Sequence, residues 1–417
     1  MIKLLQICSE VNSGSIGTIA ESIGEMALDC GWESHIAYGR SSLPSRSQIF
    51  RFESDLGVIL HGLKTRLFDR HGLGSHRATK LLINKIKKIN PDIIHLHHLH
   101  GYYINIEVLF EFLSSLNKPV VWTFHDCWSF TGHCSYFDFV GCEKWKTECN
   151  KCPQKRKYPA SWLFDRSKEN YYLKKNLFTS VPNILIVSVS KWLDNLVSES
   201  FFKHNSHIVI YNGVDVNIFK PQEVNKTIQS KYNLQDKHLI LGVASTWDDR
   251  KGLEDFVELS KLLSIDDIIV LVGLSQKQIN MLPKNIIGLS RTENKQELVE
   301  LYNIADVYMN LSVEETFGLT TAEALACGTP AIVYDATASP EIIDKDTGIL
   351  VKKKDINSLK NAFYKIKEKG KATYSDRCRE RVLDNFDQKK KYKTYIKIYK
   401  SLIKKLQTNT NSIQKKY

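Results

Sequence analysis

The chain has 417 residues, and its content of 42% hydrophobic and 25% charged residues is typical of a globular protein with two or three domains. We find no secretory signal after Met1 and no apolar run of about 18 residues, which leads us to expect a cytoplasmic protein. The formal net charge of +12 indicates an anionic partner without saying which.

The first elements form a predicted βαβ unit. Lys3–Cys8 and Ser34–Tyr38 are apolar enough for buried strands, and a helix with an apolar face lies between them. In the loop Asn12–Thr18, Gly14 and Gly17 are placed for close approach of the backbone to a ligand, although a plain tight turn fits equally well. The full G-x-G-x-x-G pattern is missing, which argues against a dinucleotide enzyme.

Residues 40–75 are polar and rich in Gly, Arg and Ser around a short apolar helix, and we expect a mobile surface segment without chemistry there. A predicted helix at 78–89 and a strand at 91–96 follow. Histidines crowd the end of this strand: His95, His97, His98 and His100. They indicate either a metal cluster or imidazoles that line a cleft and bind sugar hydroxyls.

The next predicted strand, Val120–Phe124, ends at His125 and Asp126. Because ligands bind at the carboxyl ends of parallel strands, we expect both side chains to face the ligand crevice. They form either an acid–base dyad or a helix-capping Asp beside a His without a role.

A segment rich in Cys and aromatic residues, at about 127–160, departs from the α/β pattern. Cys149 and Cys152 form a C-x2-C motif, and Cys134 and Cys142 complete a set of four thiolates that suits structural Zn²⁺. The alternative is a group of buried thiols packed among aromatic rings, which can also belong to an acceptor site. In a reducing cytoplasm, we do not expect the nine cysteines to form disulfides.

The second half repeats the alternation of strands and helices, which predicts a parallel sheet. Its predicted strands are 238–244, 268–272, 286–289, 307–311 and 331–334. After the first of them, Arg250 and Lys251 can pair with phosphate oxygens, although such a pair is often only surface charge.

A short helix between the last two strands carries the most specific pattern. Thr320 to Glu323 has the spacing of a capping box, and Gly318 allows the backbone to approach a diphosphate at the helix N-terminus. Glu315 and Glu323 can border one pocket and accept hydrogen bonds from sugar diols. Alternatively, Glu323 is only a capping residue and Glu315 a solvated loop residue.

This stretch resembles the donor-site signature of the family 4 retaining glycosyltransferases, an E-x7-E motif around F-G-L followed by E-A-x-A-x-G-x-P. The matching residues are Glu315, Phe317, Gly318, Leu319, Glu323, Ala324, Ala326, Gly328 and Pro330. His125 matches a histidine that the family often carries, and Asn212–Pro221 is similar to its interdomain linker. Ser245 departs from the pattern, because many members have a second Arg there.

The resemblance implies an α/β protein of the GT-B fold, with two Rossmann-like domains facing a cleft. We expect an acceptor domain at 1–211, a linker at 212–221 and a nucleotide-sugar domain at 222–387. The basic amphipathic helix expected at 388–417 contains ten Lys and no acidic residue. It would pack back on the first domain, and its Lys face would also suit anionic lipid.

The implied reaction is transfer of a hexose, with retention, from a UDP- or GDP-sugar to a hydroxyl of a lipid-linked glycan of the bacterial surface. No metal or cofactor is expected at the reacting centre. Arg250, Lys251 and the segment Gly318–Thr320 would stabilise the leaving diphosphate. Glu323 would hold the ribose and Glu315 the sugar hydroxyls.

The remaining implied roles fall on the first domain. His125 would orient the donor sugar, and Gly14 and Gly17 would let the domain close on it. Three other functions stay open. A nucleotide-sugar 2-epimerase would need no acceptor, a basic polyanion or membrane binder would bind in a salt-dependent way, and a zinc hydrolase would lose activity on chelation. A nucleic-acid partner is not expected, because the sequence has no recognised nucleic-acid-binding module.

Overall fold

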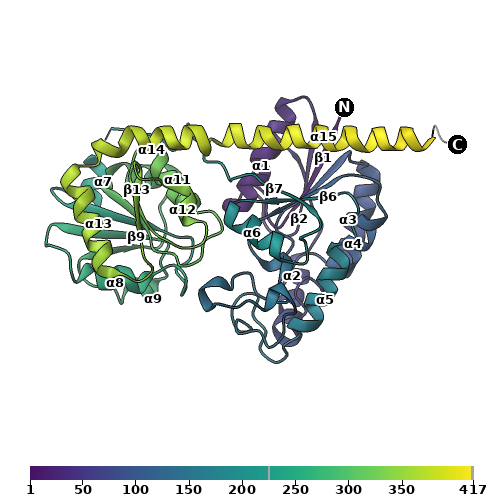
Figure 1. Ribbon diagram of the computed structural model, residues 1–417, viewed down its shortest axis with the longest axis horizontal. Coiled ribbons are helices and arrows are strands. Elements are labelled where there is room, and N and C mark those ends of the chain that lie inside the picture. Colours follow the sequence, from purple (N-terminus) through teal and green to yellow (C-terminus); the bar gives the residue numbers. More distant parts are fainter. Residues whose placement is uncertain (224–225, 415–417) are drawn as a thin grey trace. The chain divides into compact units, whose positions relative to one another are not determined.

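The computed structural model describes residues 1–223 and 226–414 (Figure 1). The chain divides into two compact units. Unit 1 comprises residues 1–211 together with the chain from Lys391 onward, and unit 2 comprises residues 212–390. Among the described residues, no helix combines the length and the apolar character needed to span a bilayer.

Unit 1 is built on a seven-stranded parallel sheet with the strand order β3-β2-β1-β4-β5-β6-β7. The strands are β1 Lys3–Cys8, β2 Glu33–Tyr38, β3 Gln48–Arg51, β4 Ile93–Leu96, β5 Val120–Phe124, β6 Ile184–Ser188 and β7 Ser206–Val209. The central strands are buried along their whole length, as expected for a parallel sheet covered on both faces. The order reverses between β1 and β4, so a ligand crevice is expected at their carboxyl ends.

The helices of unit 1 are α1 Gly14–Asp29, α2 Asp55–Phe68, α3 His76–Ile89, α4 Ile106–Ser115, α5 Ser167–Phe178 and α6 Lys191–Glu199. Helices α3, α4 and α5 lie side by side (Figure 1). The segment 40–75, expected to be a mobile surface segment around a short helix, also contains a strand that was not predicted. The segment forms strand β3, which pairs with β2, and helix α2, whose His61 ring accepts hydrogen bonds from the backbone N–H groups of Gly72 and Gly74.

Unit 2 has a six-stranded parallel sheet with the order β10-β9-β8-β11-β12-β13. Its strands are β8 His238–Val243, β9 Asp267–Val272, β10 Ile286–Leu289, β11 Val307–Asn310, β12 Ala331–Tyr334 and β13 Gly348–Val351. Its helices are α7 Lys226–Lys231, α8 Leu253–Ser260, α9 Gln276–Ile279, α10 Lys295–Ile304, α11 Leu319–Ala326, α12 Ser339–Ile342, α13 Ile356–Lys369 and α14 Ala372–Asn385. The predicted α/β class with parallel sheets is confirmed.

The last helix, α15 Gln388–Gln414, contributes to the core of unit 1. Tyr392, Tyr395 and Tyr399 project from one face of the helix and are buried against the sheet, while most of the Lys residues on its other face are exposed. The Tyr399 hydroxyl lies 2.6 Å from Nδ1 of His95 on β4, and the Tyr395 hydroxyl lies 3.1 Å from Oγ1 of Thr123 on β5. Residues 415–417 of the helix expected at 388–417 lie outside the described residues.

Candidate active site

An ion pair lies at the carboxyl ends of β8 and β11 in unit 2. The Lys251 ammonium donates a hydrogen bond to the Glu315 carboxylate, and both side chains are more than four-fifths buried. Burial by itself would raise the pKa of Glu315, but the charge and hydrogen bond of Lys251 outweigh it and hold that pKa below its usual range. Glu315 is therefore ionised near neutral pH and accepts hydrogen bonds.

Gly252 brings the Lys251 turn onto the end of β11. Its φ of +72° suits glycine, and a Cβ atom there would lie 2.4 Å from the carbonyl oxygen of Leu311. The backbone N–H of Val313 also donates to the carbonyl of Arg250 across a distance of 2.8 Å. These contacts fix the backbone positions of Arg250 and Lys251. The sequence did not indicate a role for Gly252.

Arg250 is held by a neighbouring carboxylate. Its Nη2 atom lies 2.7 Å from Oδ2 of Asp248, and its backbone N–H donates to Oδ1 of the same residue. Arg250 also acts electrostatically on Glu315. The guanidinium is thus oriented close to the Lys251–Glu315 pair, and a bound phosphate would have to share it with Asp248 or replace Asp248.

The N-terminus of α11 presents its backbone N–H groups at the same edge of the sheet. Gly318 is the N-cap residue, with φ +97° and no side-chain cap, so the predicted capping box is absent. Instead Oγ1 of Thr320 accepts a 2.7 Å hydrogen bond from the Tyr308 hydroxyl. The first N–H groups of the helix therefore have no capping side chain, as an anion-binding helix end requires.

Glu323 lies in the first turns of α11, where its Oε2 atom accepts a 3.0 Å hydrogen bond from the Tyr302 hydroxyl. Burial raises the pKa of Glu323 to about 7. Both Glu323 and Glu315 act electrostatically on Tyr308, which places the two carboxylates around one tyrosine. Phe317, by contrast, packs as a core residue: it is 2% exposed and its ring lies 5.6 Å from that of Phe386.

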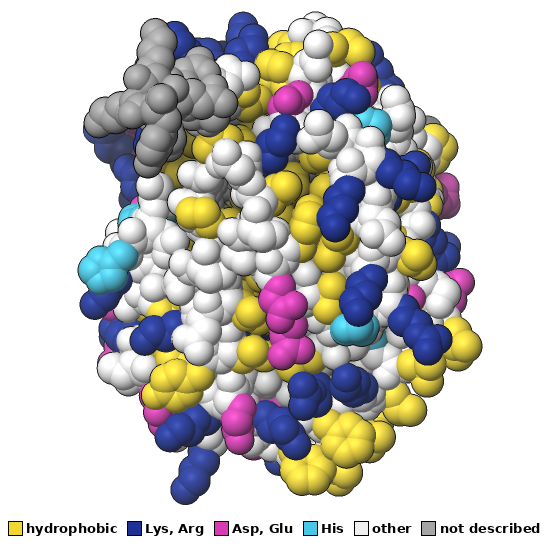
Figure 2. Space-filling model, turned by 90° about the vertical axis from the view of Figure 1, so that its right-hand side faces the viewer, with side chains coloured by type: hydrophobic (Ala, Val, Ile, Leu, Met, Phe, Trp, Pro, Cys, Tyr) yellow, Lys and Arg dark blue, Asp and Glu magenta, His cyan; other side chains and the backbone are white. Residues whose placement is uncertain are grey.

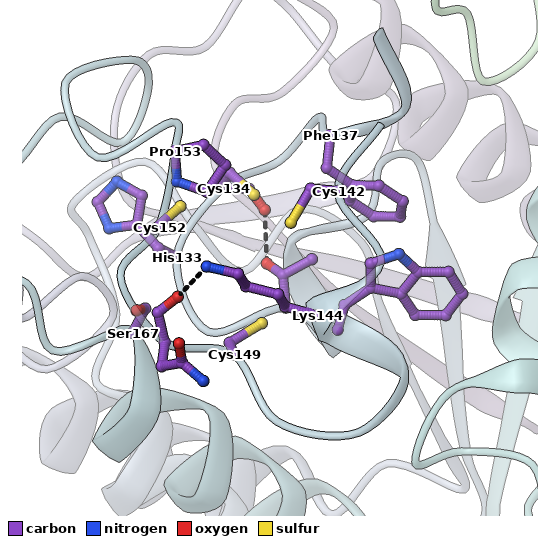
Figure 3. A pocket seen from close by; sticks show the side chains of 12 residues that line it. His133, Cys134, Phe137, Cys142, Lys144, Cys149, Cys152, Pro153 and Ser167 are labelled. Carbon is purple, nitrogen blue, oxygen red and sulfur yellow. Dashed lines mark hydrogen bonds between the residues drawn. The ribbon is translucent and has the colours of Figure 1, made fainter. Parts of the chain in front are cut away.

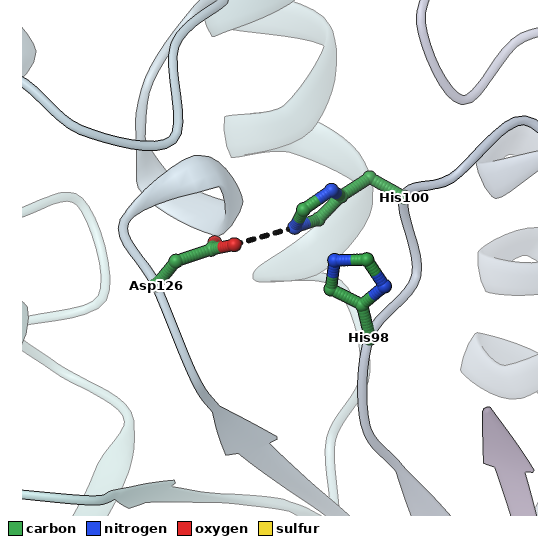
Figure 4. A group of neighbouring side chains, drawn as sticks. All are labelled: His98, His100 and Asp126. Carbon is green, nitrogen blue, oxygen red and sulfur yellow. Dashed lines mark hydrogen bonds and ion pairs between the residues drawn. The ribbon is translucent and has the colours of Figure 1, made fainter. Parts of the chain in front are cut away.

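A second group of polar side chains gathers at the carboxyl ends of β4 and β5 in unit 1. His98, His100 and Asp126 offer ligand atoms that all lie within 4.8 Å of one another (Figure 4). The His100 Nε2 atom is 2.7 Å from Oδ2 of Asp126. Burial by itself would raise the pKa of Asp126, but His100 beside it brings that pKa down to about 2. An ionised carboxylate between imidazoles suits sugar hydroxyls or a cation.

The two alternatives for His125 and Asp126 were an acid–base dyad and a capping Asp. Asp126 pairs with His100, and its Oδ1 atom accepts the backbone N–H of Trp128 at 2.9 Å, as a capping Asp would. The His125 Nε2 atom instead lies 3.5 Å from Nδ1 of His97, and burial lowers the pKa of His125 to about 4, so its ring is neutral near pH 7. His97 is in turn fixed by Gln6 at 2.9 Å. The strand-end histidines therefore divide into a buried network, which includes His95 and His97, and the outer group with Asp126.

The two glycines of the first loop play different parts. Helix α1 begins at Gly14, which is exposed and has φ +61°. Gly17 lies inside the first turn of the helix, where a Cβ atom would come within 3.0 Å of the Glu10 carbonyl oxygen. Gly17 therefore permits close packing of α1 on the segment after β1, and its expected placement in an open loop was wrong.

Comparison with known proteins identifies the family. A model described as "Glycosyltransferase Family 4" matches residues 17–218, and one described as "Glycosyl transferases group 1" matches residues 224–384. The chain belongs to glycosyltransferase family 4. The Escherichia coli protein named "Putative colanic acid biosynthesis glycosyl transferase WcaC" is 26% identical over 373 residues, which covers 86% of this chain and 89% of the relative.

Solved structures show that this family 4 glycosyltransferase has the GT-B fold. Sucrose-phosphate synthase from Thermosynechococcus elongatus superposes with a TM-score of 0.72 at 18% identity, covering 96% of this chain and 99% of that one. Anabaena Alr3699/HepE, solved in complex with UDP and glucose, has a TM-score of 0.66 at 15% identity and covers 96% of this chain and 100% of its own.

Several residues of the two candidate sites were not identified from the sequence. Tyr302 and Tyr308 are far from the two glutamates in sequence and appear there as ordinary apolar positions of a helix and a strand. His100 was noticed only as one of four histidines. A polar group at the end of a buried apolar run is a usable signal for such residues, but its partner depends on which strands become neighbours.

Proposed function

We propose that this enzyme transfers a hexose from a nucleoside-diphosphate sugar to a hydroxyl of a lipid-linked glycan, with retention, during synthesis of a bacterial surface polysaccharide. The observation that carries the proposal is the Lys251–Glu315 pair beside the uncapped N-terminus of α11. It offers a cation and free N–H donors for a diphosphate next to a carboxylate for sugar hydroxyls.

The proposed chemistry uses no metal at the reacting centre. The bond between C1 of the hexose and the phosphate oxygen breaks, and the leaving diphosphate takes the electron pair. Lys251, Arg250 and the N–H groups at Gly318–Thr320 stabilise the charge that develops there. The acceptor hydroxyl attacks C1 from the same face, and its proton passes to the departing phosphate oxygen.

The remaining roles follow the contacts of each carboxylate. Glu315 is ionised and accepts hydrogen bonds from hexose hydroxyls. Glu323, when it has lost its proton, accepts the ribose diol while Tyr302 orients it. His125 orients the donor sugar in this proposal, and the group formed by His98, His100 and Asp126 faces the acceptor hydroxyl.

Relatives support the substrate classes. The E. coli relative is named for colanic acid biosynthesis, and Alr3699/HepE was solved with UDP-glucose as well as with UDP and glucose. A surface polysaccharide is accordingly the proposed product class, and UDP-glucose is the first donor to test.

An apolar surface of unit 1 supports an acceptor held at a membrane. The outer face of α2 exposes Leu56, Ile59, Leu60 and Leu63. The segment 162–164 lies beside this helix, since the N–H of Trp162 donates to the Arg66 carbonyl and the Phe68 and Phe164 rings stack 5.9 Å apart. In Figure 2, hydrophobic side chains are interspersed with Lys and Arg along the lower edge of the molecule. Such a mixture suits the headgroup region of an anionic bilayer.

Calorimetry with a panel of UDP-, GDP-, ADP- and CMP-sugars, with and without chelator, tests the donor site. We expect one nucleotide to bind, with the same affinity under chelation, and Glu315→Ala to lower turnover in a folded protein. The exposed Glu254 of α8 provides the control Glu254→Ala. Wild-type turnover in Glu315→Ala, or no binding of any donor, would contradict the proposal.

Co-sedimentation with anionic vesicles tests the membrane surface. Replacing Leu60 and Leu63 by Gln should reduce vesicle binding and leave donor binding in unit 2 unchanged. If this variant binds vesicles normally and only substitution of the exposed Lys residues of α15 reduces binding, the Lys face is the lipid contact instead.

A further inference from the structure

We propose that Cys134, Cys142, Cys149 and Cys152 bind one structural Zn²⁺ ion, which holds the segment between β5 and α5 in place. This inference is independent of the proposed transferase function. All four cysteines come from one stretch of chain, and together they line a single small pocket (Figure 3). Cys134 and Cys149 are buried, and Cys142 and Cys152 are half-buried.

The segment needs a stabilising element that its own secondary structure does not provide. Residues 127–166 contain only three short 3₁₀ helices, η1 Trp128–Phe130, η2 Asp138–Val140 and η3 Lys144–Lys146. Segments of this length without helices or strands are uncommon in compact domains. Trp145 packs there against Phe137 and Phe130, with ring centroids 5.0 and 5.4 Å away. A metal with four ligands would cross-link the segment at four points.

The size of the pocket limits which ligands can bind there. The pocket has room for about one water molecule, which is too little for a sugar or a nucleotide. All four cysteines line this pocket, and Figure 3 shows their side chains around it. Four thiolates around one small space are the donor set that Zn²⁺ prefers in closed structural sites.

Neighbouring groups suit a negatively charged centre, since Zn²⁺ with four thiolates carries a net charge of −2. The backbone N–H of Gly132 lies 3.2 Å from Sγ of Cys149 and points at the sulfur as a donor. The buried Lys174 interacts electrostatically with Cys149 and Cys134, and its Nζ atom donates to the carbonyls of Trp128 and Thr131. In its ammonium form, Lys174 would compensate part of the charge at Cys149 and Cys134.

His133, which precedes Cys134 in the chain, also suits a bound metal. Its Nδ1 atom is 2.5 Å from Oδ1 of Asp69, and its side chain is fully buried. The other ring nitrogen, Nε2, is buried without a hydrogen-bond partner, while the ring interacts electrostatically with Cys152. A zinc-bound thiolate at Cys152 would accept this N–H, which is how outer-shell groups commonly orient metal ligands.

The zinc site would support the acceptor side of unit 1. Tyr158, which follows the last cysteine in the same segment, lies 3.0 Å from Nδ1 of His100 through its hydroxyl. His100 in turn holds Asp126. We therefore expect loss of zinc to loosen Tyr158 and to impair transfer to the acceptor, while donor binding by unit 2 remains.

Metal analysis of the purified full-length protein tests this inference without any activity assay. We expect one Zn²⁺ per chain, released when the thiols are modified with p-hydroxymercuribenzoate. Co²⁺ added to the demetallated protein should produce the intense visible bands of tetrahedral thiolate coordination. Cys142→Ser should lose at least nine-tenths of the zinc, and the exposed Cys30 provides the control Cys30→Ser, which should keep it.

Other outcomes would overturn the assignment. Absence of zinc from protein produced in zinc-supplemented medium, or equal zinc in wild type and Cys142→Ser, would refute the site. A disulfide between Cys134 and Cys152 found by mass spectrometry would replace it by a redox pair. His133→Gln should still bind zinc, with an affinity about 10-fold to 100-fold lower. An unchanged affinity would remove His133 from the site.

Discussion

Glu323 couples the stability of unit 2 to pH. Burial raises its pKa from 4.5 to about 7. The unfolded chain loses this proton near pH 4.5, while the folded chain keeps it until about pH 7, so the folded state becomes less stable as pH rises between these values. A shift of about 2.5 units at about 1.36 kcal/mol per unit gives an upper bound of about 3 kcal/mol.

Glu323→Gln removes the ionisation and keeps an oxygen to accept the Tyr302 hydrogen bond. We expect the variant to match wild type in stability at pH 4.5 and to exceed it by about 1–3 kcal/mol at pH 8. Urea denaturation at both pH values measures this difference. The exposed Glu254 of α8 provides the control Glu254→Gln, which should follow wild type at both.

Donor binding should show the opposite trend, because only the ionised carboxylate accepts both hydroxyls of a diol. Wild type should bind UDP-glucose more tightly at pH 8 than at pH 6, and Glu323→Gln should bind about 10-fold to 100-fold more weakly at pH 8 with little pH dependence. UDP-glucose is the appropriate ligand because its diphosphate does not titrate in this range. A variant that is less stable than wild type at pH 8, or unaltered in binding, would refute the reasoning.

Three further predictions concern neighbouring contacts. Lys251→Ala should weaken donor binding at least 10-fold by calorimetry, since it removes the phosphate cation; unchanged affinity would exclude Lys251 from the site. Gly252→Ala should lower both stability, by more than about 1 kcal/mol, and donor affinity, because its Cβ would meet the Leu311 carbonyl. Tyr399→Phe should cost about 1–3 kcal/mol by leaving the Nδ1 atom of His95 without its partner, with donor affinity unchanged; a normal melting temperature would contradict it.

Local sequence patterns were sufficient for most of the fold. Buried apolar runs predicted strands such as Val120–Phe124, which β5 reproduces, because a strand covered on both faces must be apolar throughout. In the segment 40–75 the sequence predicted a short helix but not strand β3. This strand lies at the edge of the sheet, is largely exposed and forms by pairing with β2, so it has no buried apolar run to reveal it.

The types of the charged residues indicated the candidate site, but their spacing in the sequence did not indicate which of them pair. Glu315 and Lys251 were both selected from sequence, but nothing in the spacing shows that they form a pair, which requires β8 and β11 to be neighbours in the sheet. The capping-box spacing at Thr320 failed for a similar reason. The Tyr308 hydroxyl on β11 engages the threonine hydroxyl, and such a competitor is visible only in the folded chain.

The sequence by itself determined the α/β class, the family and the residue types of the candidate sites, because these depend on local periodicity and on motifs within short stretches. Only the tertiary structure decided the partners. It joined Asp126 to His100 and Glu323 to Tyr302, buried His95 under Tyr399, and directed four cysteines into one pocket. The physical reason is that pairing and burial depend on which distant segments meet, and burial then sets the charge state of each group.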